Sequence, residues 1–155
     1  SEPLPGLPLM PDIGHARLYL EQATCELLAG DGWDAYVKPF RSIEDLHVLA
    51  AVTAWLYGVG LDSGWPQGLL LRLSSLLAGC AEQARQCPRA AASHVLLGGL
   101  FAQFDGLKTE LAAAFAAGPA DWAALWQRDH NLLNIAAGAR AKRLDKALQA
   151  LHLAH

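Results

Sequence analysis

Residues 42–58 read SIEDLHVLAAVTAWLYG, and this stretch decides the fold of the chain. Ser42 can cap a helix, and Asp45 follows three residues later in an approximate capping box. The apolar residues after Asp45 point in every direction around a helix, which is typical of a helix that packs on several sides. The sequence therefore predicts a central buried helix that continues to about Gly58.

Helix signals recur on both sides of this stretch. Asp12 can cap a first helix and Gly30 can end it. Pro66 and Pro88 each stand where a helix accepts its first residue. The predicted helices span residues 12–29, 42–58, 66–86, 88–104, 107–117 and 119–155, the last of them kinked or split at Gly138. Residues 31–41 are expected to form a loop with one helical turn, and no sustained alternation supports strands.

These elements predict an all-α fold. The chain has 155 residues, close to the usual domain size of about 100–150, and a domain of this size can fold without disulfides or metals. Four prolines within residues 1–11 exclude a helix there. We expect an extended, proline-rich N-terminal arm over residues 1–11. Residues 12–155 should form a single compact, irregular helical bundle of five to seven helices.

Composition limits the partners of the chain. Charged residues make up 17% of the sequence, against the usual share of about 25%. Either small residues fill a large core, or an apolar patch is kept for a partner. The formal net charge of −3 offers no concentrated positive surface, so no nucleic-acid partner is expected.

The sequence also favours a cytoplasmic, membrane-free location. The longest uncharged runs, residues 46–61 and 90–104, are shorter than the ~20 apolar residues of a membrane span. Residues 1–6 lack the basic region of a secretory signal. Cys25, Cys80 and Cys87 are odd in number, and the last two lie too far apart on one helix for a disulfide. We expect three reduced thiols.

Two histidines are candidate ligands for a cofactor. Glu44 and His47 share one helix face and form one E-x-x-H pair, a spacing that di-iron bundles use twice, so a metal site is a weak possibility. His47 and His94 each lie above a strip of small residues. Two such helices could hold haem or another planar apolar molecule between them. Direct packing with nothing between them is the favoured alternative.

Asp129 is the least expected placement in the chain. On the predicted last helix it lies in the middle of an apolar arc, with His130 beside the arc. A carboxylate in such a position must be paired, neutral or near a cap. One interpretation is a structural salt bridge with Arg72, Arg85 or Arg128, and this is favoured. The other is a functional acid with a raised pKa.

Aromatic residues in predicted loops are candidates for a partner surface. Trp33 and Trp65 stand in loops, and Tyr36 and Phe40 follow Trp33 closely. A loop tryptophan is either a lid over the core, which is favoured, or an exposed anchor for a partner. In the basic C-terminal helix Arg143 is expected on the solvated face, opposite an apolar stripe.

Three functions fit this sequence. The first expectation is a non-enzymatic interaction module, such as an adaptor, chaperone, inhibitor or regulator, that binds another protein through an apolar and aromatic surface. The alternative is a bundle that binds a cofactor, metal or planar ligand through His47, His94 or His130. The third is an enzyme that uses Asp129 and His130, which is disfavoured because nucleophile motifs are missing. A homo-oligomer is possible under each.

Overall fold

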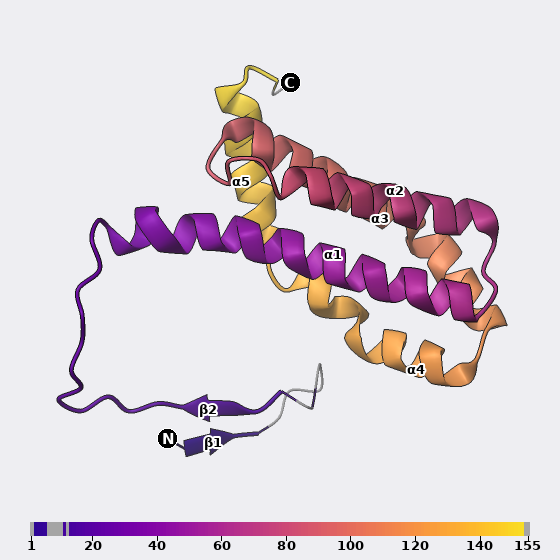
Figure 1. Ribbon diagram of the computed structural model, residues 1–155, viewed down its shortest axis with the longest axis horizontal. Helices are drawn as coiled ribbons and strands as arrows, with labels where there is room; N and C mark the ends of the chain where they lie inside the picture. Colours follow the sequence, from indigo (N-terminus) through magenta and orange to yellow (C-terminus); the bar gives the residue numbers. More distant parts are fainter. Residues whose placement is uncertain (1, 6–10, 12, 154–155) are drawn as a thin grey trace.

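The computed structural model describes residues 2–5, 11 and 13–153 (Figure 1). Its α-helices are α1 (Lys38–Asp62), α2 (Gln67–Gln83), α3 (Ala91–Ala117), α4 (Ala120–Asp129) and α5 (Ala137–Ala150). The shorter elements are the strands β1 (Glu2–Leu4) and β2 (His15–Arg17), a π-helical segment η1 (Gly32–Val37) and a 3₁₀ segment η2 (His130–Asn134). The described residues are mostly helical, which confirms the predicted all-α class. The proline-rich arm falls largely outside them.

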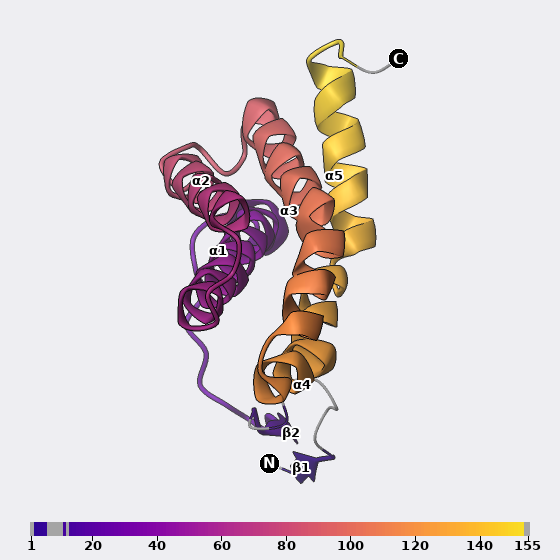
Figure 2. The same ribbon diagram turned by 90° about the vertical axis from the view of Figure 1, so that its right-hand side faces the viewer.

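The core lies where α1, α2 and α3 meet. α1 and α2 run side by side, α3 packs on α2, and α5 crosses over beside α3 (Figures 1 and 2). Leucines at helical spacing fill the contact, and each contributes about 1.5–3 kcal/mol when fully buried. The largest fully buried side chains are Leu49, Leu56, Leu69, Leu73, Leu76, Phe104 and Leu111. None of the helices in the described part of the chain is long and apolar enough to cross a bilayer.

Aromatic rings attach α4 to the far end of α1. The ring of Trp55 lies 6.1 Å from those of Phe115 and Trp122, and Phe115 stacks on Trp126 at 5.5 Å. Trp65 packs edge-on against Phe115 at 5.0 Å and is 6% exposed. Trp65 is therefore a lid over the core, and it does not belong to an exposed partner surface.

The predicted break between residues 104 and 107 is absent, because α3 runs through it without interruption. Gly106 costs a helix about 1 kcal/mol relative to alanine. Phe104, Leu107 and Leu111 are all buried on the same helix, and together their burial outweighs that cost. The last predicted helix does split, at η2, a few residues before the expected Gly138.

The helix predicted over residues 12–29 is wrong for residues 13–29. His15–Arg17 instead pairs with Glu2–Leu4 as an antiparallel strand, and residues 18–30 contain no helix. A short helix is marginal in water unless its apolar face packs on something, and the body presents no surface to these residues. Gln22 has a φ of +49°, which no right-handed helix accepts. Asp12, the expected cap, lies outside the described residues, and the predicted domain limits stay a prediction.

The predicted loop over residues 31–41 is instead helical. The Asp31 carboxylate accepts a hydrogen bond from the Asp34 backbone N–H at 2.7 Å, which caps η1. η1 continues directly into α1, so the central helix begins earlier than Ser42. This extension carries the aromatic residues of the predicted loop onto a helical backbone.

Candidate functional site

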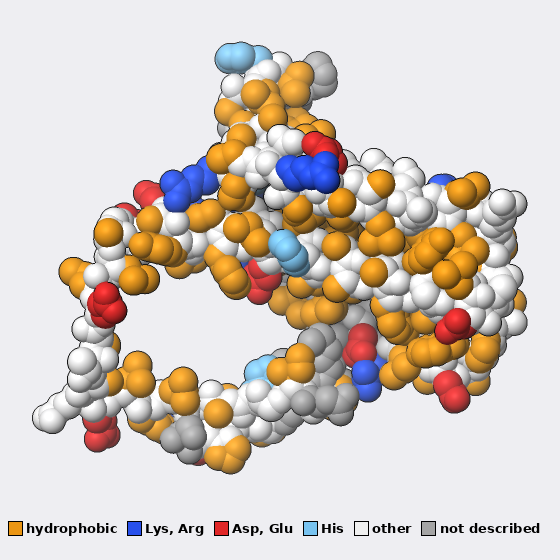
Figure 3. Space-filling model, in the orientation of Figure 1, with side chains coloured by type: hydrophobic (Ala, Val, Ile, Leu, Met, Phe, Trp, Pro, Cys, Tyr) orange, Lys and Arg blue, Asp and Glu red, His pale blue; other side chains and the backbone are white. Residues whose placement is uncertain are grey.

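Exposed apolar side chains concentrate near the N-terminus. Twelve of the eighteen exposed large hydrophobic residues in the described part of the chain precede Glu44. Residues 18–31 lead away from the helices before the chain returns to η1 (Figures 1 and 2). This segment is called the arm from here on, and it is distinct from the predicted proline-rich arm of residues 1–11. Figure 3 shows apolar side chains along the arm and over the first turns of α1, with open space between the arm and the helical body. Nothing in the described structure covers these side chains.

The aromatic surface is the helical part of this region and consists of Trp33, Tyr36, Val37 and Phe40. Trp33 is 60% exposed, Phe40 58% and Tyr36 43%. Trp33, Tyr36 and Val37 lie on the π-helical segment η1, and Phe40 lies on the first turn of α1. Trp33, Tyr36 and Phe40 were the preferred candidates for a contact surface, whereas the lid that was favoured for a loop tryptophan is wrong for Trp33, which is exposed.

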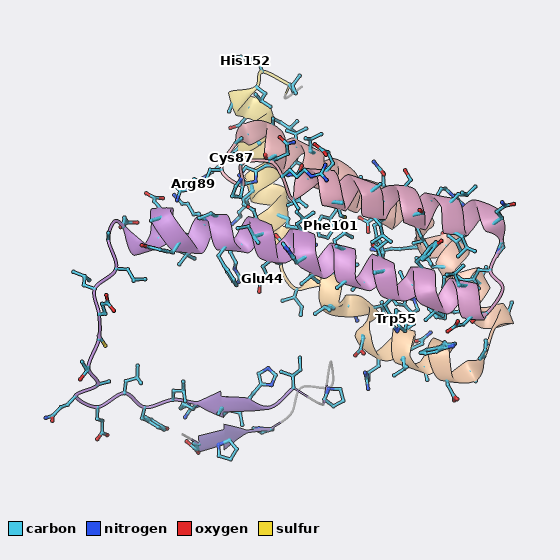
Figure 4. All side chains as sticks on the ribbon, in the orientation of Figure 1. Glu44, Trp55, Cys87, Arg89, Phe101 and His152 are labelled. Carbon is cyan, nitrogen blue, oxygen red and sulfur yellow. The ribbon has the colours of Figure 1, made fainter. Side chains whose placement is uncertain are left out.

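Several hydrogen bonds hold the aromatic surface in place. The Tyr36 hydroxyl donates to the Ala29 carbonyl at 2.8 Å. Arg89, in the loop before α3, donates to the Ala35 carbonyl at 2.9 Å and lies above the start of α1 in Figure 4. Lys38 pairs with Asp34 one turn away. The surface is thus fixed to the body on one side and open on the other.

The E-x-x-H pair gains no third ligand in the structure. Glu44 pairs with Arg41 at 2.6 Å, and His47 is exposed, with its Nδ1 2.8 Å from the Ile43 carbonyl oxygen. Among residues 2–5, 11 and 13–153, no three His, Cys, Asp or Glu side chains gather as a metal site requires. The geometry therefore gives the predicted metal site no support.

His47 and His94 nevertheless share one cavity of about 150 Å³, here called the His47 cavity. It is also lined by Ser42 and Gln83, whose Oγ and Oε1 atoms are buried and have no hydrogen-bond partner in the described structure. An engineered apolar cavity of about 150 Å³ binds benzene. A haem group is far larger, so this cavity does not fit one.

A second cavity of about 260 Å³ lies between α3 and α5 and is here called the Arg143 cavity. The buried carboxylate of Asp45 on α1 receives a hydrogen bond from Arg143 and one from Arg140 at 3.3 Å. Arg140 also donates to the Leu133 carbonyl, and its guanidinium lies 4.0 Å from the centre of the Phe101 ring. Arg143 was expected on the solvated face, and this expectation is wrong because Asp45 draws it inward.

His94 lines both cavities. Burial lowers the pKa of its imidazole, and the positive charge of Arg143 lowers it further. The effect of Arg143 shows that its charge is felt in the Arg143 cavity although Asp45 is bonded to it. His94 is therefore held in the neutral form, which can both donate and accept a hydrogen bond.

Asp129 forms a salt bridge with Arg128, in agreement with the favoured interpretation of a structural ion pair. Arg128 donates to it from Nη2 at 2.6 Å and from Nε at 2.9 Å. His130 has its Nδ1 3.0 Å from the Gln127 carbonyl oxygen, and its ring lies 5.8 Å from that of Trp126. Neither Asp129 nor His130 lines the His47 cavity or the Arg143 cavity. Neither cavity is therefore the active-site pocket that catalysis by Asp129 and His130 would require.

The three cysteines are free thiols. Cys25 and Cys87 are exposed, and Cys80 is buried in the core. Burial raises the pKa of the Cys80 thiol, which makes it a poor nucleophile. The cysteines thus offer no paired or activated group near either cavity.

Sequence analysis missed the Asp45, Arg140 and Arg143 cluster. One signal was present: Asp45 is a carboxylate on a helix that is apolar on every side, so it requires a buried cation. The partner could not be identified, because it lies 95 and 98 residues further along the chain. Comparisons of the chain with protein-family models, curated proteins and solved structures give no match.

Proposed function

We propose that this chain is an interaction module that binds another protein through the aromatic surface. The observation that carries the proposal is the concentration of exposed large hydrophobic side chains before Glu44. Monomeric proteins rarely leave large contiguous apolar patches in water, and such patches commonly mark contact sites. Tryptophan and tyrosine are also enriched among the residues that dominate binding energy.

The spacing of the aromatic surface favours a particular kind of partner. Trp33, Val37 and Phe40 have the spacing i, i+4, i+7 along the π-helical segment η1 and the first turn of α1. Helices that insert into an apolar groove present anchors in this pattern. The partner is therefore a protein with an apolar groove. The contacts of Arg89 and Tyr36 reduce the ordering cost on this side of the interface.

A photo-crosslinking residue at Val37 tests this function in cells of the protein's own host. We expect one discrete crosslinked partner, lost in the double variant Trp33→Ala, Phe40→Ala. The matched control is Leu71→Ala, Leu96→Ala, which removes two equally exposed side chains from α2 and α3. The control should crosslink as the unaltered chain does. Crosslinks that survive the aromatic double variant, or that vanish in the control, would contradict the proposal.

A second candidate function is binding of a small ligand at His94. Its support is that His94 lines two adjoining cavities and meets His47 in one of them. The position of His94 supports the ligand-binding alternative that the sequence offered, with a ligand smaller than haem. Native mass spectrometry of protein from its own host should show a small added mass that disappears on denaturation. A bare mass under several purification conditions would count against it.

A further inference from the structure

The Arg143 cavity has the size of a site for a small organic molecule. Its volume of about 260 Å³ exceeds that of the engineered cavity of about 150 Å³ that binds benzene. A six-membered ring with a short polar substituent fits this space. Figure 2 shows α3 and α5 side by side, and these two helices supply most of the wall.

The wall carries an excess of positive charge. Arg140 and Arg143 share the single carboxylate of Asp45, which leaves one positive charge uncompensated. Asp105, also on the wall, pairs with Lys108 at 2.6 Å, so it does not neutralise the arginines.

Both guanidinium groups are held in position before any ligand arrives. Arg140 is fixed by Asp45, the Leu133 carbonyl and the Phe101 ring. Within the described residues, Arg143 uses Nη2 for Asp45, and its Nε and Nη1 hold no hydrogen bond. A guanidinium fork matches the two oxygens of a carboxylate. Pre-organised donors lose little entropy when they bind.

The rest of the wall is apolar. Leu97, Leu144 and Phe101 line the cavity, and Leu144 packs closely on Gly98, where an added Cβ would lie 3.0 Å from its Cδ1 atom. These side chains favour the hydrocarbon part of a ligand. They also disfavour a dianion, since a second negative charge would be desolvated without a partner.

We infer that the Arg143 cavity binds a small monocarboxylate with an aromatic or compact aliphatic body, its carboxylate on Arg143 and its body against Phe101, Leu97 and Leu144. This inference goes beyond the protein-binding function and rests on the second candidate function, for which it names the ligand class. The carboxylate adds to the charge of Asp45 and completes the neutralisation of the two arginines.

Titration of the full chain with phenylacetate tests the inference, with the neutral isostere phenylacetamide as the matched probe. Calorimetry should give binding at least ~10-fold tighter for the acid, which corresponds to about 1.4 kcal/mol. The His94 ring, followed by NMR, should show a pKa that rises on saturation with phenylacetate and not with the amide. The direction follows because a nearby anion stabilises the imidazolium and offsets Arg143.

Several other charged or titratable groups lie near His94 and also affect its titration. Arg140 and Arg143 face it from α5, Asp45 and His47 from α1, and Asp105 lies on its own helix. His47 is the internal control: it lines the other cavity and lies outside the Arg143 cavity. Its ring resonances should shift less than those of His94 when phenylacetate binds.

Variants separate a specific site from a general charge effect. Arg143→Gln should weaken phenylacetate binding at least ~10-fold, whereas Arg85→Gln should leave it unchanged, since Arg85 is an exposed residue paired with Glu82 on α2. Ala141→Leu fills the cavity without altering charge and should also abolish binding. This second variant keeps the test decisive if Arg143→Gln does not fold.

Each adverse result has a distinct meaning. Equal affinity for the acid and the amide overturns the carboxylate class but leaves ligand binding at His94 intact. Absence of binding by both probes overturns the inference and removes support from the second candidate function. Binding that Arg85→Gln weakens as much as Arg143→Gln does is a diffuse charge effect, which also overturns the inference. The protein-binding function stands or falls separately on Trp33 and Phe40.

Discussion

At the scale of single residues, Asp45 joins the two ends of the chain. Its side chain is 7% exposed, and the guanidiniums that bind it are 16% and 23% exposed. A buried carboxylate is costly unless cations and hydrogen bonds compensate it. Here two arginines from α5 do so, and their contacts fix α5 across the end of α1.

We expect Asp45→Asn to lower the free energy of unfolding by about 2–4 kcal/mol, because removing one partner leaves two largely buried cations uncompensated. Urea unfolding followed by circular dichroism measures the change. Glu44→Gln is the control on the adjacent residue, whose ion pair with Arg41 is exposed. It should leave the free energy of unfolding nearly unchanged. If the two variants lose equal stability, the Asp45 cluster does not hold α5.

Prediction from sequence at this scale succeeded where the partner is local. Asp129 pairs with the adjacent Arg128, which is one of the three arginines that the sequence analysis named. The ion pair of Asp45 with Arg140 joins two helices that are far apart in the sequence. A local sequence pattern therefore could not identify the arginine that pairs with Asp45. Trp33 and Trp65 were both predicted to lie in loops, yet Trp33 is exposed and Trp65 is buried. The local sequence does not distinguish them, because distant residues decide which of the two rings is covered.

At the scale of elements, the end of α1 depends on close contact at Gly60. A Cβ added there would lie 2.7 Å from Leu70 Cδ2 and 2.8 Å from Trp65 Cε3. The Trp65 ring is rigid and is packed against Phe115, so it cannot move aside cheaply. The turn after α1 then closes through the Trp65 N–H, which donates to the Gly60 carbonyl at 2.8 Å.

Gly60→Ala should therefore destabilise the protein by about 1–3 kcal/mol through overpacking, even though alanine is the better helix former. Gly58→Ala, on the same helix, has no heavy atom within 4 Å of the new Cβ. It should instead stabilise the protein by up to about 1 kcal/mol. Thermal unfolding of both variants measures the contrast. Changes of the same sign would show that helix propensity, and not packing against Trp65, governs this segment.

The elements that sequence predicted well are those with a buried stripe. Leu49, Leu56 and Leu73 belong to helices whose apolar residues find a partner surface, and these helices were predicted. The helix over residues 12–29 was predicted from capping signals at Asp12 and Gly30, and residues 13–29 form none, because such signals mark where a helix could begin and end and not whether another surface covers it. Burial also carried α3 through Gly106, against the local signal.

At the scale of the whole molecule, the two ends of α1 differ in character. The Trp55 end is closed by rings from α3 and α4 (Figure 4). The other end carries the aromatic surface and the arm, where the large apolar side chains are exposed. The asymmetry places the stable core at one end and the proposed contact region at the other. The stable core and the proposed contact region therefore lie on different parts of one chain.

Limited proteolysis checks this division, because chymotrypsin cleaves exposed extended backbone far faster than packed helices. The first cuts should follow Tyr19 or one of the exposed leucines Leu18, Leu20, Leu27 and Leu28. The remaining helical fragment should unfold within about 3 °C of the full chain, since the arm buries little and its loss costs under ~1 kcal/mol. Leu71 is the internal control, equally exposed but within α2, and it should resist cleavage. Equal protection of the arm and α2 would mean that residues 18–28 pack on the body as a helix, as their sequence pattern alone predicts.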